Sequence, residues 1–201
     1  MSKRLYVAYG SNLNIQQMAS RCPGAKLYGT GVIENFELQF KGQPHGAFAT
    51  IAPKDGASVP VAVWEISKRN EQALDLYEGY PSHYFKQDVP VQLDGKEVTA
   101  MVYVMNLKMD FGLPAPYYYD VVREGYEDCG LDPAALEQAL RESTAQFYGS
   151  HWPHQESIFR FESDAEPDED ELEEDDDPDL DEDEPELDET DPFYFSEGMH
   201  L

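Results

Sequence analysis

Apolar positions in the first half of the chain follow strand-like patterns that glycine and proline interrupt. Six segments carry short apolar or alternating runs and predict strands: 5–9, 32–40, 47–51, 59–66, 84–93 and 97–105. Asp94-Gly95, between the last two runs, is typical of a two-residue hairpin turn. A Lys-Asp-Gly sequence at 54–56 predicts a second turn, between the third and fourth strands.

Helix signals occur between the strand-like runs and take over in the second half. Four segments show helical periodicity or helix-end residues: 14–21, 67–78, 117–128 and 136–147. Asn14 and Ser67 stand where N-caps are expected, Gly79 and Pro81 end the second helix, and Gly130 separates the last two. The order of these elements predicts an α+β fold with a largely antiparallel sheet.

Charge is distributed unevenly along the 201 residues. Residues 162–201 hold 22 of the 41 acidic residues and none of the 14 basic ones, so the net charge of −27 divides into −5 for 1–161 and −22 for the remainder. Repulsion and low apolar content prevent such a segment from forming a core. We therefore expect one domain at 1–161 and a disordered acidic tail at 162–201.

The expected tail allows several roles. A solubility brush is the simplest, and a weak cation sink or a nucleic-acid mimic are alternatives. Its last residues become apolar again from Phe193 to Leu201, which is compatible with a short motif that docks on a protein partner.

Composition also bears on location. Cys22 and Cys129 are the only cysteines and form no CxxC pair, which indicates free thiols in a reducing compartment, with one disulfide as the alternative. The apolar N-terminal run stops at Gly10, too early for a secretory signal, and no later run has membrane-spanning length. We expect a cytoplasmic protein with no membrane contact. Nucleic acid is not an expected partner, because neither part of the chain offers a basic patch.

The loop Tyr9-Gly10-Ser11-Asn12-Leu13 joins the first predicted strand to the first predicted helix. Gly10 lets a ligand approach the backbone, and the amides that follow lie at a helix N-terminus, where N–H groups attract anions. Such a loop can bind a carboxylate or form an oxyanion hole. An ordinary strand-to-helix turn is the alternative.

Glu78 lies in the last turn of its predicted helix, where the dipole disfavours a carboxylate by roughly 0.3–1 kcal/mol. Close to Tyr80 and other aromatic residues, it is a candidate acid with a raised pKa. A solvated surface glutamate is the alternative for this residue taken alone.

Three stretches together resemble the γ-glutamylcyclotransferase family. They are YGSNL at 9–13, LDLYEGYPSHY at 74–84, and PAPYY at 114–118 with VREGY at 122–126 and Gly-Leu at 130–131. The likeness extends over residues 5–147. It implies a small mixed β-barrel flanked by helices, with a cavity at one end.

The resemblance also implies roles for particular residues. Glu78 corresponds to the catalytic acid-base group of the family. The implied substrate-binding residues are Tyr9, Gly10, Ser11, Asn12 and Leu13 in the loop, with Tyr84 and Tyr118 as hydrogen-bonding residues of the cavity wall. Ala115 stands where many relatives have Ser, which affects only details of that wall.

The implied reaction is the cyclisation of a γ-glutamyl amide, in which the α-amine attacks its own side-chain carbonyl. Its products are 5-oxoproline and an amine or amino acid. Glu78 would take the ammonium proton and return it to the leaving nitrogen, so no cofactor is needed. The alternative is a non-catalytic γ-glutamyl-binding or interaction module whose acidic tail contacts partners. An acid kept at an unfavourable helix end favours the enzyme.

Other motifs are incomplete. Gly-Thr-Gly at 29–31 lacks the third glycine of a dinucleotide fingerprint, and no G-x-S-x-G surrounds Ser11. His151 and His154 are spaced for a metal, but Pro153 disrupts helical presentation and an ordinary loop is the simpler interpretation. We expect neither a metal nor a cofactor.

Overall fold

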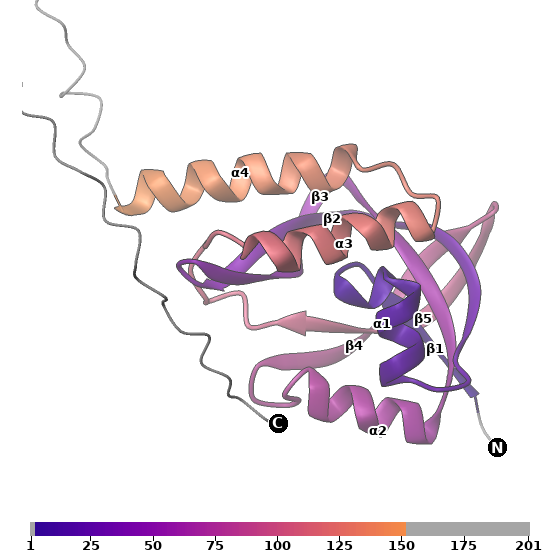
Figure 1. Cartoon of the computed structure of the whole chain (residues 1–201). Coiled ribbons are helices and arrows are strands. Elements are labelled where there is room, and N and C mark those ends of the chain that lie inside the picture. Colours follow the sequence, from indigo (N-terminus) through magenta and orange to yellow (C-terminus); the bar gives the residue numbers. More distant parts are fainter. Residues whose placement is uncertain (1–2, 152–201) are drawn as a thin grey trace, which may run out of the picture. The chain divides into compact units, whose positions relative to one another are not determined.

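Five strands close into a barrel in the computed structural model, which describes residues 3–151 (Figure 1). The strands are β1 (Lys3–Ala8), β2 (Lys26–Gln43), β3 (Gly46–Ser67), β4 (Tyr84–Leu93) and β5 (Lys96–Met105). Their order is β1-β3-β2-β4-β5, with antiparallel neighbours except for the parallel pair of β1 and β5, which completes the barrel. The expected mixed, largely antiparallel barrel is confirmed.

Helices flank this barrel. They are the short 3₁₀ helix η1 (Ser11–Leu13), α1 (Ile15–Arg21), α2 (Lys68–Tyr77), α3 (Pro116–Asp128) and α4 (Ala134–His151). In Figure 1, α2 lies on the opposite side of the barrel from α4. None of the described helices is long and apolar enough to cross a membrane.

The predicted helix ends are confirmed by their hydrogen bonds. The side chain of Asn14 accepts from the backbone amide three residues on at 2.9 Å, as an N-cap does. Ser67 and Asn70 form a reciprocal capping box at the start of α2. Gly79 has φ of 63°, which ends α2 and leaves Glu78 as its C-cap residue.

The predicted division of 47–51 and 59–66 into two strands is wrong, because β3 is continuous from Gly46 to Ser67. The residues of the predicted turn form a bulge instead. The register of pairing between β3 and β2 shifts there, so that residues 54–57 lie opposite the single residue Asn35. The Asn35 side chain accepts from the backbone amide of Gly56 at 3.0 Å. Because β3 pairs with β2 both before and after the bulge, it remains one continuous strand.

One hydrophobic core fills the barrel and extends under α3. Cys22 and Cys129 are both buried in it and unpaired, so the expectation of free thiols is confirmed for them. Gly125 of α3 approaches η1 so closely that a Cβ there would lie 2.5 Å from the backbone nitrogen of Asn14 and 2.6 Å from the Cβ of Leu13. Helix α3 therefore packs directly on the turn that follows β1.

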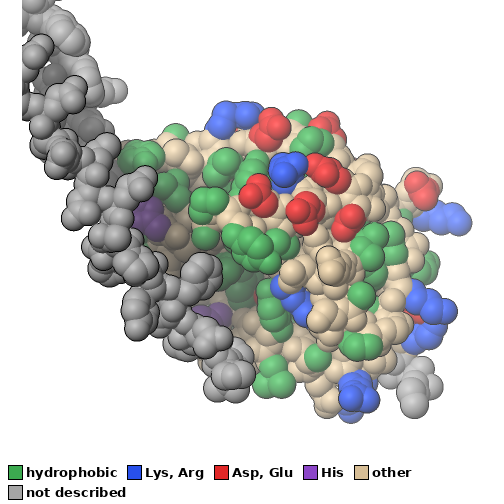
Figure 2. All heavy atoms as spheres, in the orientation of Figure 1, with side chains coloured by type: hydrophobic (Ala, Val, Ile, Leu, Met, Phe, Trp, Pro, Cys, Tyr) green, Lys and Arg blue, Asp and Glu red, His purple; other side chains and the backbone are tan. Residues whose placement is uncertain are grey.

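Figure 2 shows acidic side chains gathered over α3 and α4 on one face. These helices carry Asp120, Glu124, Glu127, Asp128, Glu137 and Glu142, against Arg123 and Arg141. Such a face repels phosphate groups. The predicted tail at 162–201 and His154 lie outside the described residues.

Candidate active site

A small polar cavity of about 30 Å³ lies where the end of β1 and the η1 turn meet the neighbouring strands and α3. Its lining residues are Tyr6, Val7, Tyr9, Gly10, Ser11, Asn12, Ala49, Glu78, Tyr84, Tyr103 and Tyr118. Glu78 is the only carboxylate in this lining, and every other side-chain oxygen belongs to a hydroxyl or an amide.

Glu78 is half-buried, and its carboxyl group lines this cavity. Burial raises its pKa from the usual range to about 7, while the Arg21 charge and a hydrogen bond from Asn12 oppose the rise. The Asn12 side-chain nitrogen donates to Glu78 Oε1 at 3.0 Å. The raised pKa expected from the sequence is present, but its main cause is burial rather than the helix end.

Arg21, in the last turn of α1, holds the loop residues Ser11 and Asn12 together. Its guanidinium donates to Ser11 Oγ at 3.0 Å and to Asn12 Oδ1 at 2.8 Å, and it lies 3.8 Å from the centre of the Tyr77 ring. A cation in the last turn of a helix is the usual complement of the dipole. The position of Arg21 in the sequence therefore gave no indication that it contacts the site, and this contact was not predicted from the sequence.

The tyrosine hydroxyls of the cavity differ in whether they donate or accept a hydrogen bond. Tyr9 donates to the backbone carbonyl of Tyr103 at 2.6 Å, and Tyr84 donates to that of Ala49 at 3.1 Å. Tyr118 instead accepts from the backbone amide of Ala49 at 3.1 Å. Burial raises the pKa of Tyr118, so this hydroxyl keeps its own proton and can donate it to a ligand.

Seven of the eight sequence-predicted site residues line the cavity. The exception is Leu13, whose fully buried side chain packs against α3 at Gly125. It is the last residue of the loop, but the η1 turn directs it into the core, so Leu13 supports the site without facing it.

Four further lining residues were missed, namely Tyr6, Val7, Ala49 and Tyr103. Ala49 and Tyr103 are far from the motifs in sequence, and only strand pairing brings them to the cavity. Tyr6 did carry a signal, since it places a hydroxyl in an otherwise apolar strand that leads into the loop. It accepts from the Asn12 side-chain nitrogen at 2.7 Å.

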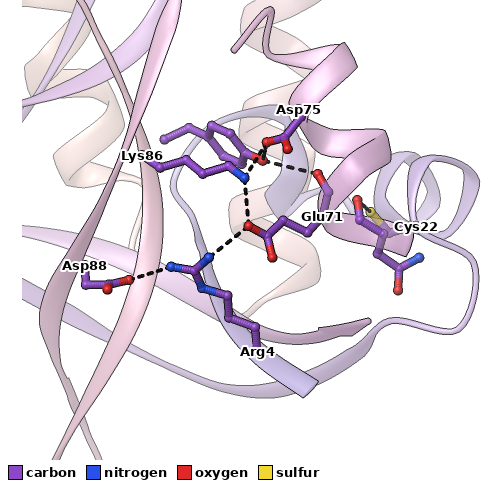
Figure 3. Close-up of polar contacts among 8 residues, drawn as sticks. Arg4, Cys22, Glu71, Asp75, Lys86 and Asp88 are labelled. Atoms are coloured by element: carbon purple, nitrogen blue, oxygen red, sulfur yellow. Dashed lines mark hydrogen bonds and ion pairs between the residues drawn. The ribbon is translucent and has the colours of Figure 1, made fainter. Parts of the chain in front are cut away.

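An ion-pair cluster joins α2 to the barrel near Glu78. Lys86 of β4 contacts Glu71 Oε1 at 2.7 Å and Asp75 Oδ1 at 2.6 Å on α2. The hydroxyl of Tyr103, a cavity residue, donates to Asp75 Oδ1 at 2.6 Å. Figure 3 shows the cluster, which Arg4 and Asp88 extend. These contacts fix the helix that ends at Glu78.

A wider groove adjoins the small cavity. It has a volume of about 670 Å³ and shares four lining residues with the cavity, namely Ser11, Glu78, Tyr84 and Tyr118. Its volume falls in the range of about 300–1,000 Å³ that is usual for small-molecule sites. Among residues 3–151 no group of three or more His, Cys, Asp and Glu side chains is arranged to hold a metal ion.

A half-buried acid with a shifted pKa, placed in a polar cavity that continues into a groove, is typical of an enzyme acting on small molecules. Comparison with known proteins agrees. The family described as "Gamma-glutamyl cyclotransferase, AIG2-like" matches residues 6–120. The chain belongs to this family and is a cyclotransferase.

Individual relatives support the assignment. A gamma-glutamylcyclotransferase of Bos taurus is 34% identical over 140 residues, covering 63% of this chain and 72% of the relative. The one of Homo sapiens is 32% identical over 146 residues, covering 68% and 77%. A solved structure named gamma-glutamyl cyclotransferase has a TM-score of 0.63 at 32% identity, covering 70% of this chain and 87% of that one.

Proposed function

We propose that this protein converts γ-glutamyl amides into 5-oxoproline and a free amine, with Glu78 as the acid-base group. The observation that carries the proposal is the carboxyl group in the cavity, whose burial raises its pKa to about 7, a value that suits a residue that must accept and then donate a proton near neutral pH. The names of the relatives support γ-glutamyl compounds as the substrate class.

The reaction requires proton transfers but no water. Glu78 takes a proton from the α-ammonium group, and the freed amine attacks the γ-carbonyl carbon, forming the ring C–N bond and a tetrahedral oxyanion whose ring nitrogen carries two hydrogens and a positive charge. Glu78 then protonates the leaving nitrogen, the oxyanion collapses, and the original amide C–N bond breaks. The ring nitrogen loses its second proton to the Glu78 carboxylate, which passes it to the released amine, so that 5-oxoproline and an ammonium ion leave and the carboxylate is restored.

The cavity provides groups for the rest of the substrate. In our proposal the Tyr118 hydroxyl donates to the carbonyl oxygen, because it accepts from the Ala49 amide and retains its own proton. The amides of Gly10, Ser11 and Asn12 bind the α-carboxylate, as N–H groups in the first turn of a helix, which lack intrahelical partners, can do. Holding the glutamyl chain folded back on itself supplies the orientation that a five-membered ring closure needs.

A non-catalytic binding module accounts for these features less well. Burying Glu78 costs free energy when the carboxyl group is ionised, and a module that only binds a γ-glutamyl group gains nothing from that cost. We therefore favour the enzyme.

The test is 5-oxoproline release from a γ-glutamyl amide, compared with two matched controls. The N-acetylated compound lacks the attacking amine, and the α-linked isomer cannot close the same ring, so both should remain intact while the parent compound is consumed. Cleavage of the N-acetylated compound at a comparable rate would show that water is the nucleophile, and the cyclisation would be wrong.

A further inference from the structure

The groove beside Glu78 is apolar along most of its length. Its apolar side chains come from β3, α2, β5 and the segment after β5, and they are Phe48, Leu76, Tyr77, Met105 and Met109. Several of them remain in solvent, with exposed fractions of 86% for Leu76, 50% for Tyr77 and 49% for Phe48. Apolar side chains that stay exposed around a groove are typical of a ligand site.

The position of the groove identifies which part of a substrate it contacts. The small cavity and the groove meet at Glu78, Ser11, Tyr84 and Tyr118. A γ-glutamyl head bound in the cavity places its scissile amide near Glu78, since this residue must reach both nitrogens. The substituent on the leaving nitrogen then extends into the groove.

The groove lacks a cation for a carboxylate. None of its lining residues is Lys or Arg. Two basic side chains that contact lining residues of the groove are already engaged: Lys41 donates to the backbone carbonyl of Met109 at 2.9 Å and lies over the Phe111 ring, and Arg21 binds the loop and Tyr77. His83 is the basic side chain that remains in the lining. An amino acid leaving group would bring its carboxylate against this surface without a partner, which is costly.

We propose that the groove binds the leaving amine and selects an apolar arylalkyl amine that carries no carboxylate. This inference rests on the proposed function and specifies its substrate. Phe48 and Tyr77 supply faces for an aromatic ring, and Leu76, Met105 and Met109 supply an adaptable apolar wall.

The direct test compares two substrates that differ by one carboxylate, γ-glutamyl-phenethylamine and γ-glutamyl-phenylalanine. We expect kcat/KM for the amine to be at least about tenfold higher, because the site leaves the extra charge unpaired. γ-Glutamyl-ethylamine should be slower than γ-glutamyl-phenethylamine by a similar factor, since it leaves the apolar wall unfilled.

A charge introduced into the groove should reverse the preference. Met109→Lys places a cation at the wall, and Leu107→Lys is the matched control, because Leu107 belongs to the same segment, is 40% exposed against 41% for Met109, and does not line the groove. Met109→Lys should raise kcat/KM for γ-glutamyl-phenylalanine relative to the amine by at least about fivefold. Leu107→Lys should leave the ratio unchanged.

The outcomes separate this inference from the function on which it rests. Release of 5-oxoproline from both substrates at equal rates, or faster from γ-glutamyl-phenylalanine, would overturn the selectivity while the cyclotransferase function stands. An equal response of the ratio to both lysine variants would show that the effect is general electrostatics and would overturn the assignment of the groove. Absence of 5-oxoproline from every γ-glutamyl compound would overturn the proposed function and this inference with it.

Discussion

The side-chain nitrogen of Asn12 donates to Glu78 Oε1 at 3.0 Å and to the hydroxyl of Tyr6 at 2.7 Å. Its oxygen accepts from Arg21 at 2.8 Å, so the amide cannot turn over without placing its NH₂ group against the guanidinium. Glu78 therefore always meets a donor. This hydrogen bond favours the ionised carboxylate and partly offsets the burial that raises its pKa.

Glu78→Gln should abolish turnover without disrupting the fold. Glutamine keeps the shape and accepts from Asn12, but it cannot take a proton, so we expect kcat to fall by at least about 10²-fold. Initial rates and circular dichroism measure the two effects. Turnover within tenfold of the wild type, about 1.4 kcal/mol of barrier, would rule Glu78 out as the base.

The same substitution should stabilise the protein at higher pH. The folded pKa of about 7 lies above the ordinary value of 4.5, so the wild type loses stability as pH rises from about 4.5 to 7. Glutamine does not titrate, and the variant should be more stable above pH 7 by roughly 1–3 kcal/mol, with the difference vanishing below about pH 4.5. Urea unfolding across this range measures it. Glu97→Gln, at an exposed position, is the control and should change stability by less than about 0.5 kcal/mol.

Arg21→Met should move the acid limb of the pH–rate profile to higher pH. The Arg21 charge lowers the pKa of Glu78, so its removal raises that pKa and the base ionises later, by up to about one pH unit. The profile of kcat/KM reports this shift. Arg69→Met, at an exposed position on α2, is the control and should leave the limb in place. An acid limb that does not move in Arg21→Met, or that moves to lower pH, would contradict the assignment of this limb to Glu78.

Gly125→Ala should destabilise the domain, because the added Cβ would lie 2.5 Å from a backbone atom and neither α3 nor the η1 turn can yield cheaply. We expect a loss of about 1–3 kcal/mol and reduced turnover, since the turn carries Ser11 and Asn12. Gly149→Ala is the matched control: it is also helical, has nothing within 4 Å, and should be neutral or stabilising. Equal thermal midpoints for the two variants would show that the close packing of α3 is unimportant.

Lys86→Met should loosen α2. The Lys86 side chain is only 18% exposed and contacts both Glu71 and Asp75, so its loss leaves two carboxylates close together without a shared cation. We expect destabilisation of about 1–2 kcal/mol, less than for a fully buried pair. Arg123→Met, which breaks exposed pairs within α3, is the control and should cost less than about 0.5 kcal/mol. Similar losses in both variants would indicate that the cluster does not anchor the helix.

A chain ending at Phe161 should keep its thermal midpoint and its turnover. Every proposed catalytic or binding residue lies before Tyr119, and residues 162–201 are too acidic to add to a core. Both chains are compared at moderate salt. A drop in turnover beyond about tenfold would mean that the segment after Phe161 contributes to the site.

Local signals predicted the element ends because caps and turns act within a few residues. Asn14 and Ser67 begin their helices and Gly79 ends α2, as expected, and Asp94-Gly95 forms the hairpin turn between β4 and β5 with φ of 47° and 75°. The same reasoning failed at 54–56, where pairing with β2 overrides the turn and a bulge results. Strand continuity depends on partners that a local pattern does not contain.

The sequence by itself determined the α+β barrel, the loop from Tyr9 to Asn12 and the position of the acid Glu78. Only the tertiary structure decided that this acid has a pKa of about 7, that Arg21 orients Asn12 beside it, and that an apolar groove continues from the cavity. The physical reason is that desolvation depends on every neighbour that excludes water. Strand pairing and the packing of α3 bring these neighbours together from distant parts of the chain.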